Sequence, residues 1–276
     1  MHFLEVKNLR KSFIKSAATT GFAKWGQAKR KIEVLKDVNF EIKQGETLGL
    51  VGESGSGKST ISRLIMHLMD YEGEIVFEGV NLAELKKQEP AEFRKKRCDI
   101  QMIFQDPYAS LNPTMTIYET IAEAVVARRG KEFAKQEGGE SLKNRVKQLM
   151  SQVSLKEDWA SRYPHEFSGG QRQRIAIARA IAAEPKLLIA DEAVSALDVS
   201  VQAQVLNLLQ ELKEDLNLTL LFISHDLEVV RYVSDRVMVI DKGNIVEVAD
   251  SKTLFESPQH DYTKKLLAAR RSVTLA

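Results

Sequence analysis

The sequence predicts an α/β fold, because strand-like and helix-like segments alternate along most of its length. Near the N-terminus, residues 47–51 form a short apolar run, residues 52–60 (GESGSGKST) are rich in glycine and serine, and residues 61–68 have helical spacing. Two further apolar runs, 187–190 and 218–223, have the length and composition of buried strands. Such alternation is typical of a parallel sheet covered by helices. The apolar positions of the first helix are Ile61, Leu64, Ile65 and Leu68.

Length and composition set limits on the class of protein. The chain has 276 residues, 40 Lys plus Arg against 38 Asp plus Glu, and 43% hydrophobic residues, as expected of a folded protein. No apolar run approaches the roughly 20 residues of a membrane-spanning helix, and the N-terminus lacks a signal-peptide core. The nearly balanced charge gives no reason to expect nucleic acid as a partner. The single cysteine, Cys98, excludes an intrachain disulfide framework and fits a reducing compartment. We therefore expect one soluble domain over residues 1–276.

The first elements are predicted to be strands. Residues 3–6 and 34–42 alternate in part between apolar and polar residues, and residues 71–79 have the pattern of another strand pair. Between the first two strands, residues 15–31 carry five basic residues, no acidic ones and no core-forming periodicity. We predict a long exposed hairpin loop there, solvated or facing lipid headgroups, with a nucleic-acid contact as the other interpretation.

Helices dominate the middle of the chain. Residues 84–97 are charged and predicted to be helical, residues 100–104 form a buried strand, and residues 116–153 are helical with a polar interruption over 130–140. The last of these helices has one apolar face. Its members are Leu142, Val146, Leu149, Met150 and Val153. We expect a helical subdomain within about 106–180, inserted between strands of the α/β pattern.

The C-terminal part returns to the α/β pattern. Residues 201–212 are predicted to form an amphipathic helix, and residues 236–248 a hairpin that turns at Lys242-Gly243. About 250–276 is expected to be a short tail, helical around 262–267.

Residues 52–60 match G-x-x-x-x-G-K-[ST], the pattern of a phosphate-binding loop. Gly55 and Gly57 allow the backbone to turn so that successive N–H groups point at a phosphate. Lys58 can reach the β- and γ-phosphates of a nucleotide, and the Ser59 hydroxyl can ligate Mg²⁺. The predicted nucleotide contacts of the loop are Gly52, Ser54, Gly55, Ser56, Gly57, Lys58, Ser59 and Thr60.

Two acids, Asp191 and Glu192, follow the predicted strand 187–190 directly. Acids at a strand end are often no more than solvated termini, but the phosphate-binding loop upstream favours a catalytic role. In enzymes with such a loop, the first acid holds Mg²⁺ and the second orients or polarises the attacking water. General-base help of this kind is worth ~10²–10⁴-fold in rate. Glu192 is therefore the first catalytic candidate.

The remaining motifs resemble those of a known family. Residues 167–174 (FSGGQRQR) look like the signature motif of ATP-binding cassette (ABC) ATPases. Gln105 matches the family's Q-loop glutamine, residues 195–198 (SALD) match its D-loop, and His225 matches its switch histidine. The resemblance covers essentially the whole chain. It implies a P-loop NTPase fold, the ABC ATPase cassette, with an antiparallel β subdomain and an inserted α-helical subdomain, and it implies ATP and Mg²⁺ as ligands.

The resemblance also implies that one molecule carries two half-sites and no complete one. Ser168, Gly169, Gly170 and Gln171 would form a second anion cradle before a helix, and in the family this cradle closes on the ATP bound by the other subunit. Asp198 would act across the same interface; a helix N-cap is the competing interpretation. A second cassette, identical or different, is the expected partner.

Three more roles come from the resemblance. Gln105 would ligate Mg²⁺ together with Ser59 and Asp191, and would link the site to the helical insert. His225 would hydrogen-bond the γ-phosphate and hold Glu192 and the water in line, which makes it the second catalytic candidate.

Two positions stay open. Phe13 is the candidate for the aromatic residue that stacks on adenine, with a core phenylalanine as the alternative. The family usually has Pro-Thr after the acid pair, whereas this chain has Ala193-Val194. The loss of the proline can loosen the path into the D-loop, but it leaves the motif residues on either side in place.

Three segments are similar to the peptide and nickel importer branch: residues 105–113 (QDPYASLNP), 163–165 (YPH) and 254–264. This implies an ATPase subunit peripheral to the cytoplasmic face of the membrane. Its partners would be two membrane-spanning permease subunits and an extracytoplasmic substrate-binding protein, with no nucleic acid. Residues 108–116 would line the groove for the permease's coupling helix. Peptide, nickel, another metal chelate and some oligosaccharides remain open as the transported substrate.

Two alternatives come from other classes. A cassette of this branch also serves as a soluble component of carbon–phosphorus lyase machinery, in phosphonate metabolism, although the residues after Gln105 are of the importer type. DNA-repair and ribosome-associated ATPases usually need tandem cassettes, coiled-coil insertions or zinc-binding cysteines, none of which occurs in this sequence.

Overall fold

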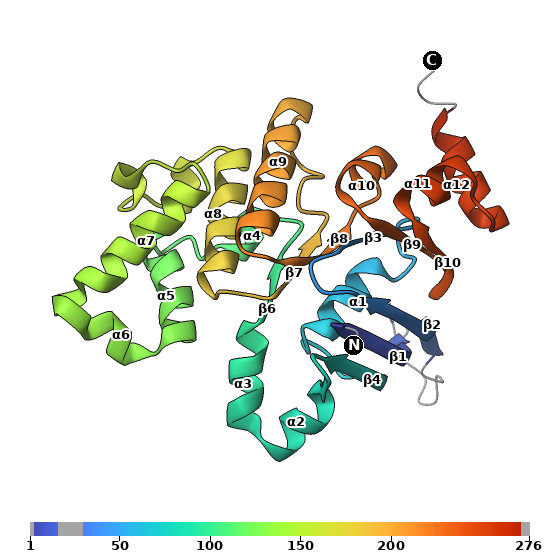
Figure 1. Ribbon diagram of the computed structural model, residues 1–276, viewed down its shortest axis with the longest axis horizontal. Coiled ribbons are helices and arrows are strands. Elements are labelled where there is room, and N and C mark those ends of the chain that lie inside the picture. Colours follow the sequence, from blue (N-terminus) through green and yellow to red (C-terminus); the bar gives the residue numbers. More distant parts are fainter. Residues whose placement is uncertain (1–2, 16–29, 272–276) are drawn as a thin grey trace, which may run out of the picture.

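The computed structural model describes residues 3–15 and 30–271, and its centre is a six-stranded sheet of order β10-β9-β3-β8-β7-β6 (Figure 1). All neighbouring strands pair in parallel except β9 and β10, which form an antiparallel hairpin. The strands are β3 (Thr47–Val51), β6 (Ile100–Ile103), β7 (Leu187–Asp191), β8 (Thr219–Ile223), β9 (Arg236–Asp241) and β10 (Asn244–Asp250). The predicted α/β fold with a parallel sheet is confirmed.

Burial explains why these strands are continuous apolar runs rather than alternating ones. Every residue of β3, β7 and β8 is buried, because helices cover one face of the central sheet while a helix and the antiparallel sheet pack against the other. At the edge, the hairpin turns through Lys242 and Gly243, both at positive φ (45° and 83°), as predicted from their sequence.

A second, antiparallel sheet has the order β2-β1-β4-β5. Its strands are β1 (Leu4–Lys15), β2 (Arg30–Ile42), β4 (Glu72–Phe77) and β5 (Val80–Asn81). β1 and β2 are longer than predicted, and residues 16–29 of the predicted basic loop lie outside the described residues. The predicted strand pair within 71–79 is displaced, since the turn falls at Glu78 and Gly79 and its second strand follows them.

Helix α1 (Lys58–Ile65) follows the phosphate-binding loop as predicted, and Ile61, Leu64 and Ile65 are fully buried. The prediction that Leu68 continues this apolar face is wrong, because its side chain is 48% exposed. The helix ends at Ile65, and His67 takes a left-handed φ of 52°, which turns the chain toward β4.

Further helices surround the two sheets. They are α2 (Leu82–Gln88), α3 (Pro90–Cys98), α4 (Pro107–Ser110), α5 (Ile117–Arg129), α6 (Lys131–Lys135), α7 (Glu140–Gln152), α8 (Gly169–Ala182), α9 (Val199–Asp215), α10 (Leu227–Val233), α11 (Ser251–Glu256) and α12 (Asp261–Arg271), with 3₁₀ turns η1 (Gln136–Gly139), η2 (Glu157–Trp159) and η3 (Pro164–Glu166). The single helix predicted over 84–97 is two helices, because Pro90 has no N–H for a continuous ladder and starts α3 instead. Within the described ranges, none of the helices combines the length and apolar character needed to cross a membrane.

Helices α5 to α8 gather beside the β6 edge of the sheet and form the helical subdomain (Figure 1). The predicted apolar face of α7 is buried, with Val146, Leu149, Met150 and Val153 fully inaccessible. The polar segment 130–140, whose glycines predicted an interruption of the helices, contains the short helix α6. α5 ends where Gly130 takes a φ of 86°.

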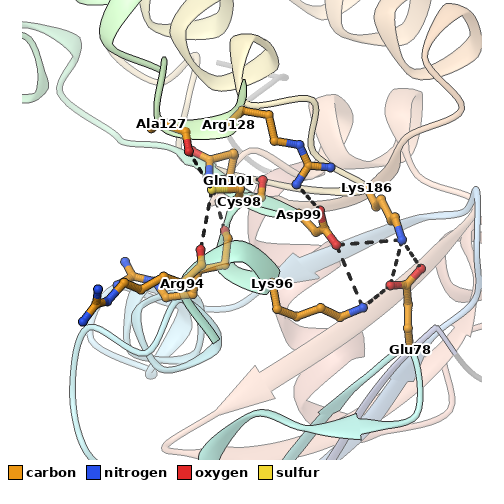
Figure 2. A network of polar contacts seen from close by, with 10 residues as sticks. Glu78, Arg94, Lys96, Cys98, Asp99, Gln101, Ala127, Arg128 and Lys186 are labelled. Atoms are coloured by element: carbon orange, nitrogen blue, oxygen red, sulfur yellow. Dashed lines mark hydrogen bonds and ion pairs between the residues drawn. The ribbon is translucent and has the colours of Figure 1, made fainter. Parts of the chain in front are cut away.

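A network of charged side chains joins the helical subdomain to both sheets (Figure 2). Asp99, just before β6, accepts a hydrogen bond from Arg128 of α5 at 2.8 Å. Lys186, just before β7, pairs with Glu78 in the turn between β4 and β5 of the antiparallel sheet at 2.8 Å, and Lys96 of α3 contacts the same carboxylate. Because most of these groups are largely shielded from water, the network fixes three parts of the molecule at one point.

Candidate functional site

The phosphate-binding loop connects the buried strand β3 to α1. Gly55 and Gly57 both take positive φ values, 78° and 115°, which favour glycine. A Cβ at Gly57 would lie 2.6 Å from Leu35 Cδ2, so packing against β2 also demands glycine there. Gly52 is required for a different reason, since a Cβ there would lie 2.3 Å from the Ile240 carbonyl oxygen. The glycines therefore serve both the turn and its close approach to neighbouring strands.

Lys58 lies folded against its own loop. Its Nζ donates hydrogen bonds to the carbonyl oxygens of Gly52 (2.8 Å) and Glu53 (3.0 Å). Burial lowers the pKa of the Lys58 ammonium, and the carboxylates of Glu192 and Asp191 oppose that shift. The cation is thus presented by the loop at the mouth of a site that also holds two acids.

Asp191 ends β7 and faces the start of α1. Its two carboxylate oxygens accept hydrogen bonds from Ser59 Oγ and Ser62 Oγ, both at 3.1 Å. Burial raises the pKa of the Asp191 carboxyl, while the two hydroxyls act to lower it. Ser62 was missed by the sequence reasoning, although its spacing of three residues from Ser59 places both on one helix face. The carboxylate, hydroxyl and amide oxygens of Asp191, Ser59 and Gln105 are the donor types that Mg²⁺ prefers.

Glu192 is held between two other predicted site residues. Its Oε2 accepts a hydrogen bond from Gln105 Nε2 at 2.9 Å and lies 3.4 Å from His225 Nδ1. The residue takes a left-handed φ of 50°, and its N–H donates to the Ile223 carbonyl oxygen at 2.9 Å. Strain of this kind is typical of functional sites. The ends of β6, β7 and β8 therefore bring Gln105, Glu192 and His225 together.

An open cavity of about 410 Å³ lies over the loop. Its lining includes Phe13, Val34, Lys58, Gln105 and Glu192. Phe13 is 41% exposed, so the alternative of a core phenylalanine is wrong. The ring reaches the rim from the antiparallel sheet, and Lys11 Nζ lies 5.3 Å from its centroid.

Ser168, Gly169, Gly170 and Gln171 stand at the start of α8 and do not line that cavity. Ser168 and Gln171 form a capping box, in which Ser168 Oγ accepts from the Gln171 N–H and Gln171 Oε1 accepts from the Ser168 N–H. Gly170 has a packing role, because a Cβ there would lie 2.3 Å from Val201 Cγ1 of α9.

Asp198 occupies the N-cap position of α9, and its side chain makes no capping hydrogen bond. The side chain is exposed.

The Ala193-Val194 pair is buried, at 2% and 1% exposure. Behind it, Ser195 Oγ donates to the Glu192 carbonyl oxygen at 2.9 Å, and Gln202 Nε2 donates to that of Val194 at 3.3 Å. Apolar packing and these two bonds hold the segment between Glu192 and Asp198 without the proline.

Comparisons with known proteins agree with these motifs. A family model described as ABC transporter matches residues 35–195. The oligopeptide transport ATP-binding protein OppF of Bacillus subtilis (strain 168) is 47% identical over 268 residues, which cover 96% of this chain and 81% of that protein. OppF of Streptococcus mutans is 48% identical over 267 residues, covering 96% and 80%. A putative peptide import ATP-binding protein of Brucella ovis is 50% identical over 240 residues, covering 86% and 73%.

Solved structures give the same result. The dimeric post-hydrolysis structure of the ATP-binding cassette MJ0796, bound to ADP and Pi, has a TM-score of 0.72 and 29% identity, covering 90% of this chain and 98% of that one. The structure of cbiO1 from Clostridium perfringens has a TM-score of 0.74 at 24% identity, covering 99% and 98%, and supports the fold. The family model spans more than half of the chain, and the relatives cover nearly all of it. This chain is therefore an ATP-binding cassette that belongs to the ABC transporter family.

Proposed function

We propose that this chain is the ATP-hydrolysing subunit of a peptide importer. One observation carries the hydrolytic part: the Glu192 carboxylate lies beside the phosphate-binding loop, held by Gln105 at 2.9 Å and facing His225 at 3.4 Å. The peptide assignment is supported by the relatives named for oligopeptide transport and peptide import.

The residues of the cavity support a division of roles. The backbone N–H groups around Gly55 and Gly57 would bind the phosphates. Lys58 would give its third ammonium N–H to the β- and γ-phosphates while the loop carbonyls hold it in place. Phe13 would stack on adenine at the rim. Because a π-face makes few base-specific contacts, we expect loose nucleotide specificity.

Glu192 would accept a proton from the attacking water, with Gln105 and His225 fixing the direction of its carboxylate. Ser59, Asp191 and Gln105 would hold Mg²⁺, which neutralises negative charge on the phosphates when bound. Ser168, Gly169, Gly170, Gln171 and Asp198 would complete the site of a second cassette.

A second cavity supports docking of a membrane partner. It has a volume of about 350 Å³ and is lined by Phe104, Asp106, Ala109 and Ser110, next to Gln105 and Asp191. Tyr108, in the same short helix as Ala109 and Ser110, is exposed and lies within the segment predicted to receive a coupling helix. Its position beside Gln105 gives a direct path from the hydrolytic site to a permease at the cytoplasmic face of the membrane.

Uptake in cells lacking this gene tests the proposal. We expect loss of uptake of a labelled tetrapeptide and retention of nickel uptake, with rescue by the wild-type chain but not by Glu192→Gln. Peptide uptake that survives deletion would contradict the importer assignment. Co-purification with carbon–phosphorus lyase subunits instead of membrane proteins would support the alternative function.

A further inference from the structure

The C-terminal helices α11 and α12 lie beside β9 and β10, beyond the part of the chain that the family model matches (Figure 1). The turn between the two helices is anchored on β10. Glu247 accepts hydrogen bonds from the backbone N–H groups of Gln259 (2.8 Å) and His260 (3.0 Å), and His260 Nδ1 accepts from the Tyr262 N–H at 3.2 Å. The start of α12 is therefore held in a defined place relative to the central sheet.

From this position, Tyr262 reaches the phosphate-binding loop. Its hydroxyl oxygen accepts a hydrogen bond from the backbone N–H of Glu53 at 3.2 Å, across 209 residues of sequence. The ring is partly buried against the larger hydrophobic core, together with Leu266 and Leu267. Burial also raises the pKa of the Tyr262 phenol, so the group stays protonated at neutral pH.

Tyr262 and Lys58 bind opposite sides of the same peptide group. The Glu53 N–H and the Gly52 carbonyl belong to the same planar peptide. Tyr262 accepts from the N–H, while the carbonyl accepts from Lys58 Nζ at 2.8 Å. Because a planar peptide rotates as a unit, release of its N–H also frees the carbonyl that places the Lys58 ammonium.

We propose that Tyr262 is a positioning residue for ATP binding, acting through the peptide that joins Gly52 to Glu53 and through Lys58. The proposal rests on the ATP-binding function above and deepens it, since it makes α12 a support of the nucleotide site. Tyr262 does not line the cavity over the loop and needs no contact with the nucleotide.

The substitution Tyr262→Phe tests this, because it keeps the ring and removes only the hydroxyl. We expect the Kd for ATP, measured by calorimetry without Mg²⁺ to prevent hydrolysis, to rise about fivefold. That factor corresponds to about 1 kcal/mol, the typical net value of one hydrogen bond. The unfolding midpoint of the nucleotide-free protein should fall by no more than about 4 °C, since one hydrogen bond is lost while ring packing is kept.

Tyr232→Phe is the matched control. The Tyr232 hydroxyl donates to Asn207 Oδ1 at 3.0 Å on the surface of α10, away from the loop, so its removal should leave the Kd unchanged. The proposal is overturned by an unchanged Kd in Tyr262→Phe, by an equal rise in Tyr232→Phe, or by a rise that accompanies a fall in the unfolding midpoint of more than about 4 °C. Failure of the wild-type chain to bind ATP would instead contradict the proposed function.

Discussion

Glu192 shows how single residues are placed by strand ends rather than by their neighbours in sequence. Gln105, Glu192 and His225 follow β6, β7 and β8, which are adjacent in the sheet. Their carboxyl ends therefore meet, and the side chains lie within 3.4 Å of the Glu192 carboxylate. Parallel sheets bind ligands at this edge for the same reason.

Substitution of Phe13 tests whether its ring stacks on adenine. We expect Phe13→Ala to raise the Kd for ATP by about three- to tenfold, in line with roughly 1 kcal/mol for aromatic stacking. Phe13→Trp should keep binding close to wild type, since it offers a π-face at the same rim. Binding measured by calorimetry without Mg²⁺ decides this. An unchanged Kd in Phe13→Ala would contradict the proposed stacking of Phe13 on adenine.

Helices α8 and α9 approach each other closely at Gly170, so this residue affects how the two helices pack. A Cβ at Gly170 would lie 2.3 Å from Val201 Cγ1, whereas one at Gly169 would make an ordinary contact at 3.5 Å with Leu197 Cδ2. The glycine pair thus divides into one residue fixed by packing and one with room for a methyl group. The sequence motif alone does not make this distinction.

We expect Gly170→Ala to lower the free energy of unfolding by about 1–2 kcal/mol, because overpacking outweighs the gain in helix propensity. Urea denaturation of the nucleotide-free chain measures this. Gly169→Ala is the matched control and should be neutral or slightly stabilising. Val201→Ala should relieve the Gly170→Ala defect in the double variant. Equal stability of the two alanine variants would refute the packing role.

At the scale of the whole molecule, the two proposed half-sites lie on different parts of the chain. The phosphate-binding loop and Glu192 line one cavity, while Ser168 to Gln171 stand at the start of α8 outside it. A second cassette supplies the missing face in the proposed function. The network around Asp99 ties the helical subdomain, which carries the second of these proposed half-sites, to both sheets (Figure 2).

His67 makes the stability of the folded chain depend on pH in the acid range. Burial, with Lys86 and Arg97 nearby, lowers the pKa of His67 from 6.5 to about 4. Between these values the unfolded chain binds the proton and the folded chain does not, so stability falls as the pH drops through this window. The loss is at most about 3 kcal/mol, reduced by solvent at the partly exposed ring.

His67→Asn should flatten the dependence of unfolding free energy on pH between about 6.5 and 4.5, because no titrating group remains at that position. Asparagine tolerates the left-handed backbone there, where φ is 52°. Urea denaturation at several pH values measures the slope for both proteins. Identical slopes would contradict a His67 that stays neutral in the folded chain.

Much of the fold could be predicted because its strands are buried apolar runs and its loop motif has a fixed spacing. The ends of elements were harder. Leu68 fits the helical period, yet its helix stops at Ile65, and helix α6 forms between Gly130 and Gly138. Ser62 was missed although it shares a helix face with Ser59, and Tyr262 was missed because a contact across 209 residues leaves no local pattern. Gly170 was predicted to contact an anion. Its packing against Val201 depends on how helices α8 and α9 cross, which the sequence does not show.

The rate of ATP hydrolysis by Glu192→Gln, measured together with its affinity for ATP, tests the central claim most directly. Glutamine keeps the size of the side chain but cannot accept the proton of the attacking water. We expect the rate to fall by about 10²–10⁴-fold while the Kd for ATP stays within a few-fold of wild type, so that ATP is trapped in a stable closed dimer. Hydrolysis at the wild-type rate would contradict the role assigned to Glu192.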